Sequence, residues 1–514
     1  MAARLAAAVD AVDQALRKSH AMRGWLRGRR WCGESLGART ELAVKDRAVL
    51  RETGLEVLVM FLAVAREPNA SIPIHLPLSI STARMDPGAL ELPVGPDRVY
   101  VTEAERRESY ARAVVEGFQR RQTLGTVAGD TLHFHGDPFG AFASAAPEGE
   151  DTSNLLARIR TSEREVVLKS YKLLDPGNRE ADILGRLSKK AFGHVPRFLG
   201  EIALGEGTDR LVLAVVTEHV PSTDAFAWLT EGWAAELGGP AAPDFERASL
   251  SFASSLGEAT AGLHEALADK HAGTFQTERF TAEDAEAAVK AALANLGDSL
   301  RRLAAFARGP DAPLTDLAAA ARARVIEGRE GIEAALVGLE ACVGTAKGVT
   351  HADLHLGQVL RASDGDLLFI DFEGEPERAP GERSAKIPFL RDVATMNRSF
   401  AYVKHYVWRE ATRGDATAAW RLLDPKGWTP EDAAIAHRLT AWETAAVERH
   451  TRAYLAKSSL HESMPPEDAR RAIRGWTMEK ALYELRYELK HRPQNIFIPL
   501  EGVLALAEPF ERVA

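Results

Sequence analysis

The hydrophobic pattern of the first part of the chain is typical of strands. Apolar runs of strand length alternate with polar stretches, and one helical segment is expected at residues 103–121. The strand-like runs are residues 55–64, 72–80, 99–102 and 131–135. The first twenty residues instead have the apolar spacing of an amphipathic helix. We therefore expect an α+β module up to residue 136.

A different pattern follows a stretch rich in Gly, Ala, Pro and Asp at residues 136–151, which is typical of a linker or exposed loop. Two strand-like runs, a helical segment and a third apolar strand come next, in that order. They are residues 154–159, 165–171, 178–190 and 211–218. After residue 226 the spacing is mostly helical, apart from a β-type island at residues 348–372.

Composition narrows the classes of protein that this pattern can form. The chain has 514 residues and a formal net charge of −9, which argues against a nucleic-acid partner because such partners need a basic surface. The apolar stretch at residues 55–65 is far shorter than the roughly 20 residues that span a bilayer, so we expect no membrane partner. Cys32 and Cys342 stand far apart and in no CxxC pair. We therefore expect neither a disulfide framework nor a zinc site, and place the protein in the cytoplasm.

The clearest chemical signal lies in the β-type island. Asp353 stands in a short predicted loop, where a carboxylate can orient a substrate hydroxyl and accept its proton. Gln358 follows five residues later, and a predicted hairpin then ends at Asp371. Mg²⁺ favours carboxylate and amide oxygens, so Gln358 and Asp371 predict a magnesium site. This spacing, HxDxxxxQ followed by a hairpin that ends in Asp, is the pattern of the protein-kinase-like superfamily.

Residues before this island are candidates for holding the phosphates of ATP. Lys169 ends an apolar strand, where its ammonium can pair with the α- and β-phosphates. The next helix should carry an acid that fixes this lysine; Glu180 and Asp182 both qualify, and periodicity does not choose between them. No GxGxxG motif precedes Lys169, and we expect Ser153 and Asn154 to cover the phosphates in its place.

Two further segments complete the expected site. Backbone groups of Glu218 and Val220, which follow an apolar strand, are expected to meet the adenine ring. In the C-terminal helix, an apolar stripe predicts core packing, while a neighbouring face gathers charged and aromatic groups of the kind that hold sugars. The members of this face are Lys480, Tyr483, Glu484, Tyr487 and His491. An ordinary solvated face is the alternative.

Several segments together resemble bacterial maltokinases, which belong to the aminoglycoside-phosphotransferase group of the protein-kinase-like superfamily. The segments are residues 30–33, 351–360, 370–376, 390–394, 479–488, 492–493 and 498–500. The resemblance covers nearly the whole chain and is densest in its second half. It implies an α+β, bilobal, aminoglycoside-phosphotransferase-like fold with an N-terminal α+β cap and a mostly helical C-terminal lobe.

The expected parts are a cap subdomain at residues 1–136, an ATP-binding subdomain at 137–235, and a helical lobe with the catalytic loop and sugar site at 236–514. The resemblance implies ATP- and Mg²⁺-dependent phosphorylation of maltose to maltose 1-phosphate, a role in glycogen and trehalose metabolism, and a complex with trehalose synthase. By the same resemblance Asp353 is the catalytic base, Gln358 and Asp371 bind Mg²⁺, and Lys169 holds ATP. We also expect His351 and Glu373 at the substrate.

The chain departs from this family in three places. Ala352 replaces the usual glycine of the catalytic loop, where a Cβ restricts the backbone. The tryptophan turn reads Trp-Cys-Gly-Glu, and the helix acid at the best-aligned position is Asp182, which is shorter than Glu. These departures leave open a kinase for another sugar, such as glucosamine. A nucleotide-binding module without turnover is a further alternative, against which the intact set of Lys169, Asp353, Gln358 and Asp371 argues.

Other polar residues are expected to be structural. Asp392 is expected to brace the catalytic loop from the following helix, or to pair with Arg391. His264 is expected to pack between helices. His133 and His135 alternate on a predicted strand with too few partners for a metal site.

Overall fold

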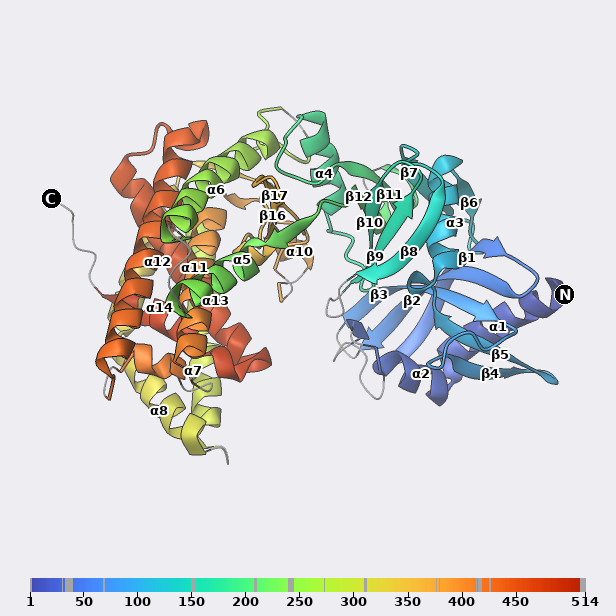
Figure 1. Cartoon of the computed structure of the whole chain (residues 1–514), viewed down its shortest axis with the longest axis horizontal. Coiled ribbons are helices and arrows are strands. Elements are labelled where there is room, and N and C mark those ends of the chain that lie inside the picture. Colours follow the sequence, from blue (N-terminus) through green and yellow to red (C-terminus); the bar gives the residue numbers. More distant parts are fainter. Residues whose placement is uncertain are drawn as a thin grey trace. The chain divides into compact units, whose positions relative to one another are not determined.

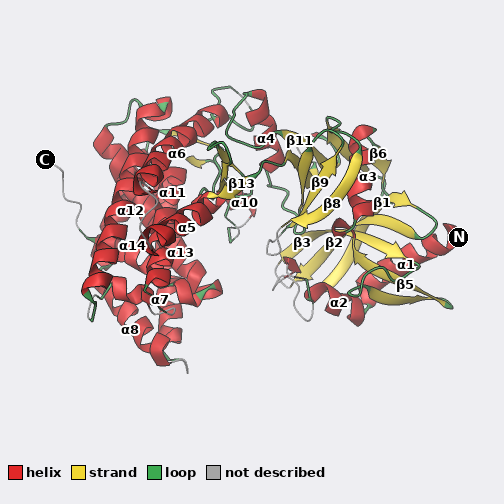
Figure 2. Ribbon diagram, viewed as in Figure 1, coloured by secondary structure: helices red, strands yellow, loops and turns green. Residues whose placement is uncertain are grey.

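The computed structural model describes residues 2–29, 31–32, 40–67, 70–148, 154–207, 210–238, 245–271, 273–308, 312–375, 377–378, 380–412, 414, 418–424 and 427–508. The chain divides into two compact units (Figure 1). The first consists of Met1–Ser188 and Pro196–Val220, and the second of Lys189–Val195 and Pro221–Ala514. Strands dominate the first unit and helices the second (Figure 2), so the expected α+β class is confirmed.

A five-stranded antiparallel sheet opens the first unit, with strand order β1-β2-β3-β5-β4. Its strands are β1 (Glu41–Glu52), β2 (Glu56–Glu67), β3 (Ala70–Ser81), β4 (Leu90–Val94) and β5 (Asp97–Glu103). Helices α1 (Ala2–Lys18) and α2 (His20–Arg27) pack their apolar faces against one side of this sheet, as the helical spacing of the first residues predicts. Residues on the other side of the sheet, such as Leu58 and Met60, belong to a second core.

That second core joins the five-stranded sheet to a seven-stranded sheet of order β6-β7-β11-β12-β10-β9-β8. The strands are β6 (Thr123–Gly125), β7 (Thr131–Gly136), β8 (Phe142–Glu148), β9 (Leu155–Thr161), β10 (Glu165–Ser170), β11 (Phe198–Leu204) and β12 (Leu211–Glu218). The short helix η2 (Ala104–Arg106) and α3 (Glu108–Gln119) contribute residues to the same core, and α4 (Glu180–Lys189) follows β10. The expected cap and ATP-binding subdomains thus lie in one unit.

Three expectations about this unit and its boundaries need correction. Strand β8 lies within the segment expected to be a linker, because its backbone pairs with β9 at the edge of the sheet. Strands β6 and β7 pair with each other and β7 pairs with β11, so the expected boundary at residue 136 cuts through the seven-stranded sheet. The boundary expected near residue 235 lies at Val220.

The second unit is mostly helical. Its helices are α5 (Ala225–Gly238), α6 (Phe245–Leu267), α7 (Ala282–Phe306), α8 (Ala312–Glu327), α9 (Arg329–Leu336), η4 (Val337–Cys342), η5 (Leu356–Gln358), α10 (Pro380–Arg383), α11 (Leu390–Ala411), η6 (Ala418–Leu422), α12 (Pro430–Lys457), η7 (Ser459–His461), α13 (Pro466–His491), η8 (Pro493–Asn495) and α14 (Phe497–Ala507). Gly328 separates α8 from α9, and η4 directly follows α9. Helix α11 is buried along nearly its whole length and contacts α5, α12, α13 and α14.

Two small sheets complete the second unit. One has the order β13-β16-β17 and the other β14-β15-β18. The strands are β13 (Ser222–Asp224), β14 (Glu278–Arg279), β15 (Ala346–Gly348), β16 (Val359–Ala362), β17 (Leu367–Phe369) and β18 (Ile387–Pro388). The β16–β17 hairpin is the one that the sequence predicts between Gln358 and Asp371. Among the described residues, the buried thiols of Cys32 and Cys342 form no disulfide, and no helix is both long and apolar enough to cross a bilayer.

Candidate functional site

The catalytic loop of the second unit follows β15 and has a strained backbone at two positions. Ala352 and Asp371 both have φ of +67°, a left-handed conformation that costs a residue with a Cβ about 1–3 kcal/mol. The restriction expected at Ala352 is therefore real. Since such backbone persists only where neighbouring contacts hold it, the contacts around these two residues explain how the loop keeps its shape.

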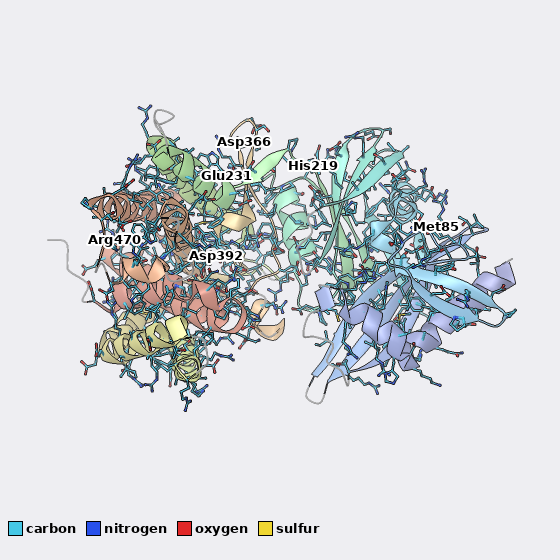
Figure 3. All side chains as sticks on the ribbon, turned by 60° about the horizontal axis from the view of Figure 1, so that its bottom comes forward. Met85, His219, Glu231, Asp366, Asp392 and Arg470 are labelled. Carbon is cyan, nitrogen blue, oxygen red and sulfur yellow. The ribbon has the colours of Figure 1, made fainter. Side chains whose placement is uncertain are left out.

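Asp392, in the first turn of α11, supplies the first of these contacts. Its Oδ2 accepts a hydrogen bond from the His351 N–H at 2.8 Å, and its Oδ1 accepts one from the Ala352 N–H at 3.1 Å. His264 Nε2 lies 3.3 Å from the same carboxylate, which is fully buried inside the helical unit (Figure 3). Burial alone would raise the pKa of Asp392, but the hydrogen bond and charge of His264 and the loop N–H groups lower it. The expected bracing by Asp392 is thus observed, and His264 contributes to it.

His351 supports the catalytic loop from inside the unit, and its expected contact with substrate stays a prediction. Its side chain is fully buried, and its Nε2 lies 2.9 Å from the carbonyl oxygen of Ile370. The ring packs against Phe372, with 4.7 Å between the ring centroids. His351 therefore connects the loop of Asp353 to the residues on either side of Asp371 and does not line the pocket described below.

Gln358 and Asp371 are brought together as predicted. The Gln358 amide nitrogen donates to Asp371 Oδ2 at 2.9 Å, and the N–H of Ile370 donates to the Gln358 carbonyl oxygen at 3.0 Å. The pair offers an amide oxygen and a carboxylate, the hard donors that Mg²⁺ prefers. These residues therefore fit a magnesium ion.

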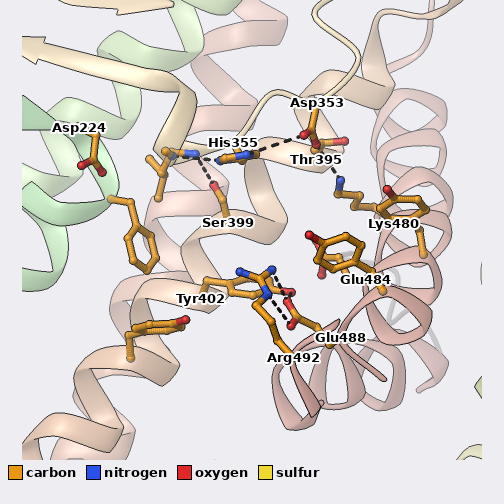
Figure 4. Close-up of a pocket in the computed structure, with 16 residues that line it drawn as sticks. Asp224, Asp353, His355, Thr395, Ser399, Tyr402, Lys480, Glu484, Glu488 and Arg492 are labelled. Atoms are coloured by element: carbon orange, nitrogen blue, oxygen red, sulfur yellow. Dashed lines mark hydrogen bonds and ion pairs between the residues drawn. The ribbon is translucent and has the colours of Figure 1, made fainter. Parts of the chain in front are cut away.

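A pocket of about 410 Å³ lies beside the catalytic loop (Figure 4). The residues that line it are Asp224, Phe226, Asp353, His355, Leu356, Gly357, Thr395, Ser399, Tyr402, Tyr406, Lys480, Tyr483, Glu484, Tyr487, Glu488 and Arg492. It includes Asp353 and four of the five members of the face predicted on the C-terminal helix, which is α13, whereas His491 is not among the lining residues. Glu373 is not among the lining residues, and its substrate role stays a prediction. The volume is within the range of small-molecule sites.

Lys480 connects the pocket to a buried ionic network. Its ammonium lies 3.2 Å from Asp353 Oδ1 and 2.6 Å from Glu375 Oε1. Burial alone would lower the pKa of Lys480, but the carboxylates of Glu375 and Asp353 raise it, so the ammonium stays charged. Lys480 therefore holds one oxygen of Asp353.

The rest of this network lies behind Glu375. Arg391 donates to Glu375 at 2.8 Å and to Glu479 at 3.1 Å, and Arg378 contacts the same two acids. Arg391 thus pairs with these acids, and the alternative pairing with Asp392 is not observed. No pattern in the sequence indicates this network, although Glu375 and Glu479 lie in segments that carry the family resemblance.

The remaining acids of the pocket differ in their partners. Glu484 pairs with Arg398 at 2.9 Å. Glu488 accepts hydrogen bonds from Arg492 at 2.7 Å and from the Tyr402 hydroxyl at 3.0 Å. Asp224, at the end of β13, accepts the Ala227 N–H at 2.8 Å and has no ion pair within the described part of the chain. No spacing in the sequence pointed to Asp224 or Tyr402, whereas Glu488 lies in a segment that carries the family resemblance.

The first unit holds the candidate nucleotide lysine. Lys169, near the end of β10, lies 2.7 Å from Glu180 Oε2, so Glu180 is its partner. Asp182, the better-aligned candidate, instead pairs with Arg210 at 2.7 Å, which corrects its expected role. The physical reason is that α4 begins at Glu180, and residues two apart in a helix point to different sides.

The other predicted nucleotide contacts stay predictions. Ser153 lies outside the described residues, and Asn154 is a buried residue directly before β9. Glu218 ends β12, where its N–H donates to the carbonyl oxygen of Arg197 at 2.9 Å, and Val220 is the last residue of the first unit. His133 and His135 stack on β7 with 5.0 Å between ring centroids, and no group of metal ligands forms around them in the described residues.

Comparison with known proteins identifies similar chains. Residues 145–400 match the family described as the phosphotransferase enzyme family. A glucosamine kinase of Streptacidiphilus jiangxiensis is 28% identical over 234 residues, which are 45% of this chain and 48% of that protein. A glucosamine kinase of Mycolicibacterium smegmatis is 28% identical over 298 residues, 58% of this chain and 63% of that protein. In both cases the match spans less than two thirds of the relative's own length.

A solved structure shares the fold. It is a glucosamine kinase in complex with glucosamine, ADP and inorganic phosphate, and it superimposes with a TM-score of 0.58 at 20% sequence identity. The superposition covers 94% of this chain and 98% of that one. Together with the family match, it confirms the expected aminoglycoside-phosphotransferase-like kinase fold. Neither curated relative described above is a maltokinase.

Proposed function

We propose that this chain, whose residues 145–400 belong to the phosphotransferase enzyme family, is an ATP- and Mg²⁺-dependent sugar kinase with glucosamine as its first acceptor. The observation that carries the proposal is the position of Asp353. Its carboxylate lines a pocket of about 410 Å³ together with charged and aromatic groups. In the same unit, Gln358 and Asp371 lie in hydrogen-bond contact as a donor pair for Mg²⁺.

The proposed reaction is in-line transfer of the γ-phosphoryl group. The hydroxyl oxygen of the sugar forms a bond to the γ-phosphorus while the bridging P–O bond of ATP breaks, and ADP leaves. Asp353 orients the hydroxyl and accepts its proton through Oδ2, because Lys480 holds Oδ1. When bound at Gln358 and Asp371, Mg²⁺ neutralises phosphate charge. In the first unit Lys169, held by Glu180, pairs with the phosphates of the nucleotide.

Charge favours an amino sugar as acceptor. Four carboxylates line the pocket, from Asp224, Asp353, Glu484 and Glu488, against the two cations of Lys480 and Arg492. Three of these acids contact cations, whereas Asp224 has no ion pair in the described part of the chain. An ammonium group on the substrate is the complement of such an acid. The two glucosamine kinases among the relatives support the same acceptor.

Maltose, which the family resemblance implies, is the second candidate. The rings of Tyr483 and Tyr487 are stacked in the pocket wall, with 6.3 Å between their centroids and an interplanar angle of 17°. Aromatic side chains are large apolar surfaces that carry a polar group at one end, which suits the face of a second sugar ring. This observation favours a disaccharide, whereas the excess of acids favours the amino sugar.

The test is ADP release from Mg²⁺ and ATP with glucosamine, maltose, glucose, trehalose or no sugar. We expect turnover that depends on sugar and on Mg²⁺, fastest with glucosamine. Turnover with maltose alone would support the proposed mechanism and show that maltose, not glucosamine, is the acceptor. ATP binding without transfer to any of these sugars would contradict the proposed function and favour a nucleotide-binding module without turnover.

A further inference from the structure

The side chains of residues 169–172, the segment that carries the nucleotide lysine, contact two different acids in turn. Residues 169 and 171 contact one acid: Lys169 Nζ and the Tyr171 hydroxyl donate to the same Glu180 oxygen at 2.7 and 2.6 Å. Ser170 and Lys172 contact another, since Ser170 Oγ and Lys172 Nζ donate to one Glu105 oxygen at 3.2 and 2.6 Å. This alternation follows from the extended backbone, in which successive side chains point to opposite faces.

Glu105 lies next to the five-stranded sheet. It lies in η2, which directly follows β5. The ion pair with Lys172 is buried on both sides, with side-chain exposures of 0% for Lys172 and 2% for Glu105. The Lys172 ammonium also lies 5.1 Å from the ring centre of Trp31, whose indole donates to Glu103 at 2.7 Å. Lys172 is thus surrounded by residues from the N-terminal part of the chain.

The backbone after β10 also joins the five-stranded sheet. The N–H of His75, in β3, donates to the Lys172 carbonyl oxygen at 2.9 Å, and His75 Nδ1 lies 3.0 Å from the carbonyl oxygen of Tyr171. Two residues later, the Leu174 N–H donates to the Pro73 carbonyl oxygen at 2.8 Å. The strand that carries Lys169 in the seven-stranded sheet therefore continues into contact with an inner strand of the five-stranded sheet.

We propose that the five-stranded sheet positions the nucleotide lysine, and that Glu105 and Lys172 are the positioning residues. The buried ion pair fixes the side chains of Ser170 and Lys172 toward Glu105. Because successive side chains of an extended segment point to opposite faces, the side chain of Lys169 is then directed toward Glu180. This inference rests on the proposed function, which assigns Lys169 to the phosphates of ATP. It gives the N-terminal sheet a part in nucleotide binding without placing any of its residues on the nucleotide.

The test is the dissociation constant of Mg²⁺-ATP, measured by calorimetry on the full chain. Lys172→Met removes the ammonium, and we expect ATP binding to weaken on the order of tenfold, with the sugar KM at saturating ATP unchanged. Because a single substitution leaves a buried charge without its partner, the variant can fail to fold. The double variant Glu105→Gln with Lys172→Met leaves no unpaired charge and is expected to fold with the same weakening.

Leu5→Ala is the matched control. Leu5 is buried on α1, in the core between α1, α2 and the five-stranded sheet, and no hydrogen bond or ion pair joins it to Glu105 or Glu180 in the described residues. We expect this variant to lower the melting temperature and to leave ATP binding unchanged. Unchanged ATP binding in a folded Lys172→Met or double variant would overturn the inference, as would equal weakening in Leu5→Ala.

The same measurements separate this inference from the proposed function. If the unchanged protein bound ATP but transferred phosphate to no sugar, the proposed function would fail, and the comparison of dissociation constants would still decide the inference. If sugar turnover were normal while Lys172→Met bound ATP as tightly as the unchanged protein, only the inference would fail. A protein that did not bind ATP at all would contradict both.

Discussion

The two candidate sites are supported in different ways. In the first unit, Lys169 and Glu180 are eleven positions apart, and a strand followed by the start of a helix brings them together. In the second unit, Ala352 and Asp353 are held by residues 40 and 127 positions further along the chain. The first site depends on regular secondary structure, whereas the second depends on buried charges and on left-handed backbone. We therefore expect the second site to be more sensitive to residues that touch no substrate.

The largest expected effect is that of Asp353→Asn. An amide cannot accept the proton of the sugar hydroxyl, so kcat should fall by about a thousandfold. ATP binding, which we assign to Lys169 and its partner, should be unchanged. The measurement is kcat by ADP release together with the ATP dissociation constant. Wild-type turnover by the variant would remove Asp353 from the role of base.

The second largest effect is expected for Lys480, whose ammonium contacts Asp353. Lys480→Met removes one of the three cations that contact Glu375 and releases Asp353, so we expect kcat to fall by about a hundredfold. The free energy of unfolding should fall by about 3–5 kcal/mol, as when one partner of a buried pair is removed. Urea unfolding and steady-state kinetics measure both quantities.

Lys490→Met is the control for this variant. It removes the same charge from the same helix, but the side chain is 38% exposed and its pair with Glu377 should contribute less than about 1 kcal/mol. Equal losses in the two variants would show that the buried network has no special role. The difference between them is thus the direct measure of how far the second site depends on its surroundings.

Acid pH should weaken both units through buried histidines. Burial lowers the pKa of His75, in the first unit, and of His450, in the second, to about 3. Since the unfolded value is about 6.5, the unfolded chain binds more protons between these pH values, and stability falls as the pH falls. Each histidine should remove about 2 kcal/mol of unfolding free energy between pH 7 and pH 5.

The measurement is urea unfolding at both pH values for the unchanged protein and for His75→Gln and His450→Gln. Each substitution should reduce the loss of unfolding free energy between pH 7 and pH 5 by about 2 kcal/mol. An unaltered loss in both variants would mean that other groups cause the acid sensitivity. A reduction in only one would show which unit controls it.

The smallest expected effect is that of Ala352→Gly. Glycine adopts φ of +67° without a steric cost, but it also increases the entropy of the unfolded chain. We expect a net gain in unfolding free energy of less than about 1 kcal/mol, with kcat unchanged. Ala394→Gly, inside helix α11, should instead cost about 1 kcal/mol. A loss of stability in both variants would contradict the strain assigned to the catalytic loop.

The comparison also explains what could be predicted from sequence. Asp353, Gln358 and Asp371 fall within one short motif, so their spacing is sufficient to single them out as candidates. Glu180 and Asp182 could not be separated, because the choice depends on the residue at which α4 begins. Strand β8 was missed because its composition is typical of a loop and its pairing with β9 decides its structure.

No short motif in the sequence contains the residues that support the catalytic loop together with their partners. Glu375 pairs with Lys480 across 105 positions and with Arg391 across 16, and neither separation follows a helix or strand period. Asp224 enters the pocket from β13, far from the motif along the chain. These partners are fixed by the packing of α11 and α13, which a single sequence does not reveal.

The most direct test of the central claim is transfer of label from γ-labelled ATP to glucosamine, in the presence of Mg²⁺, by the unchanged protein and by Asp353→Asn. The account predicts label in a phosphorylated sugar with the unchanged protein and almost none with the variant, while both bind ATP equally. Bound ATP with label released only as inorganic phosphate, or equal labelling of the sugar by both proteins, would contradict it.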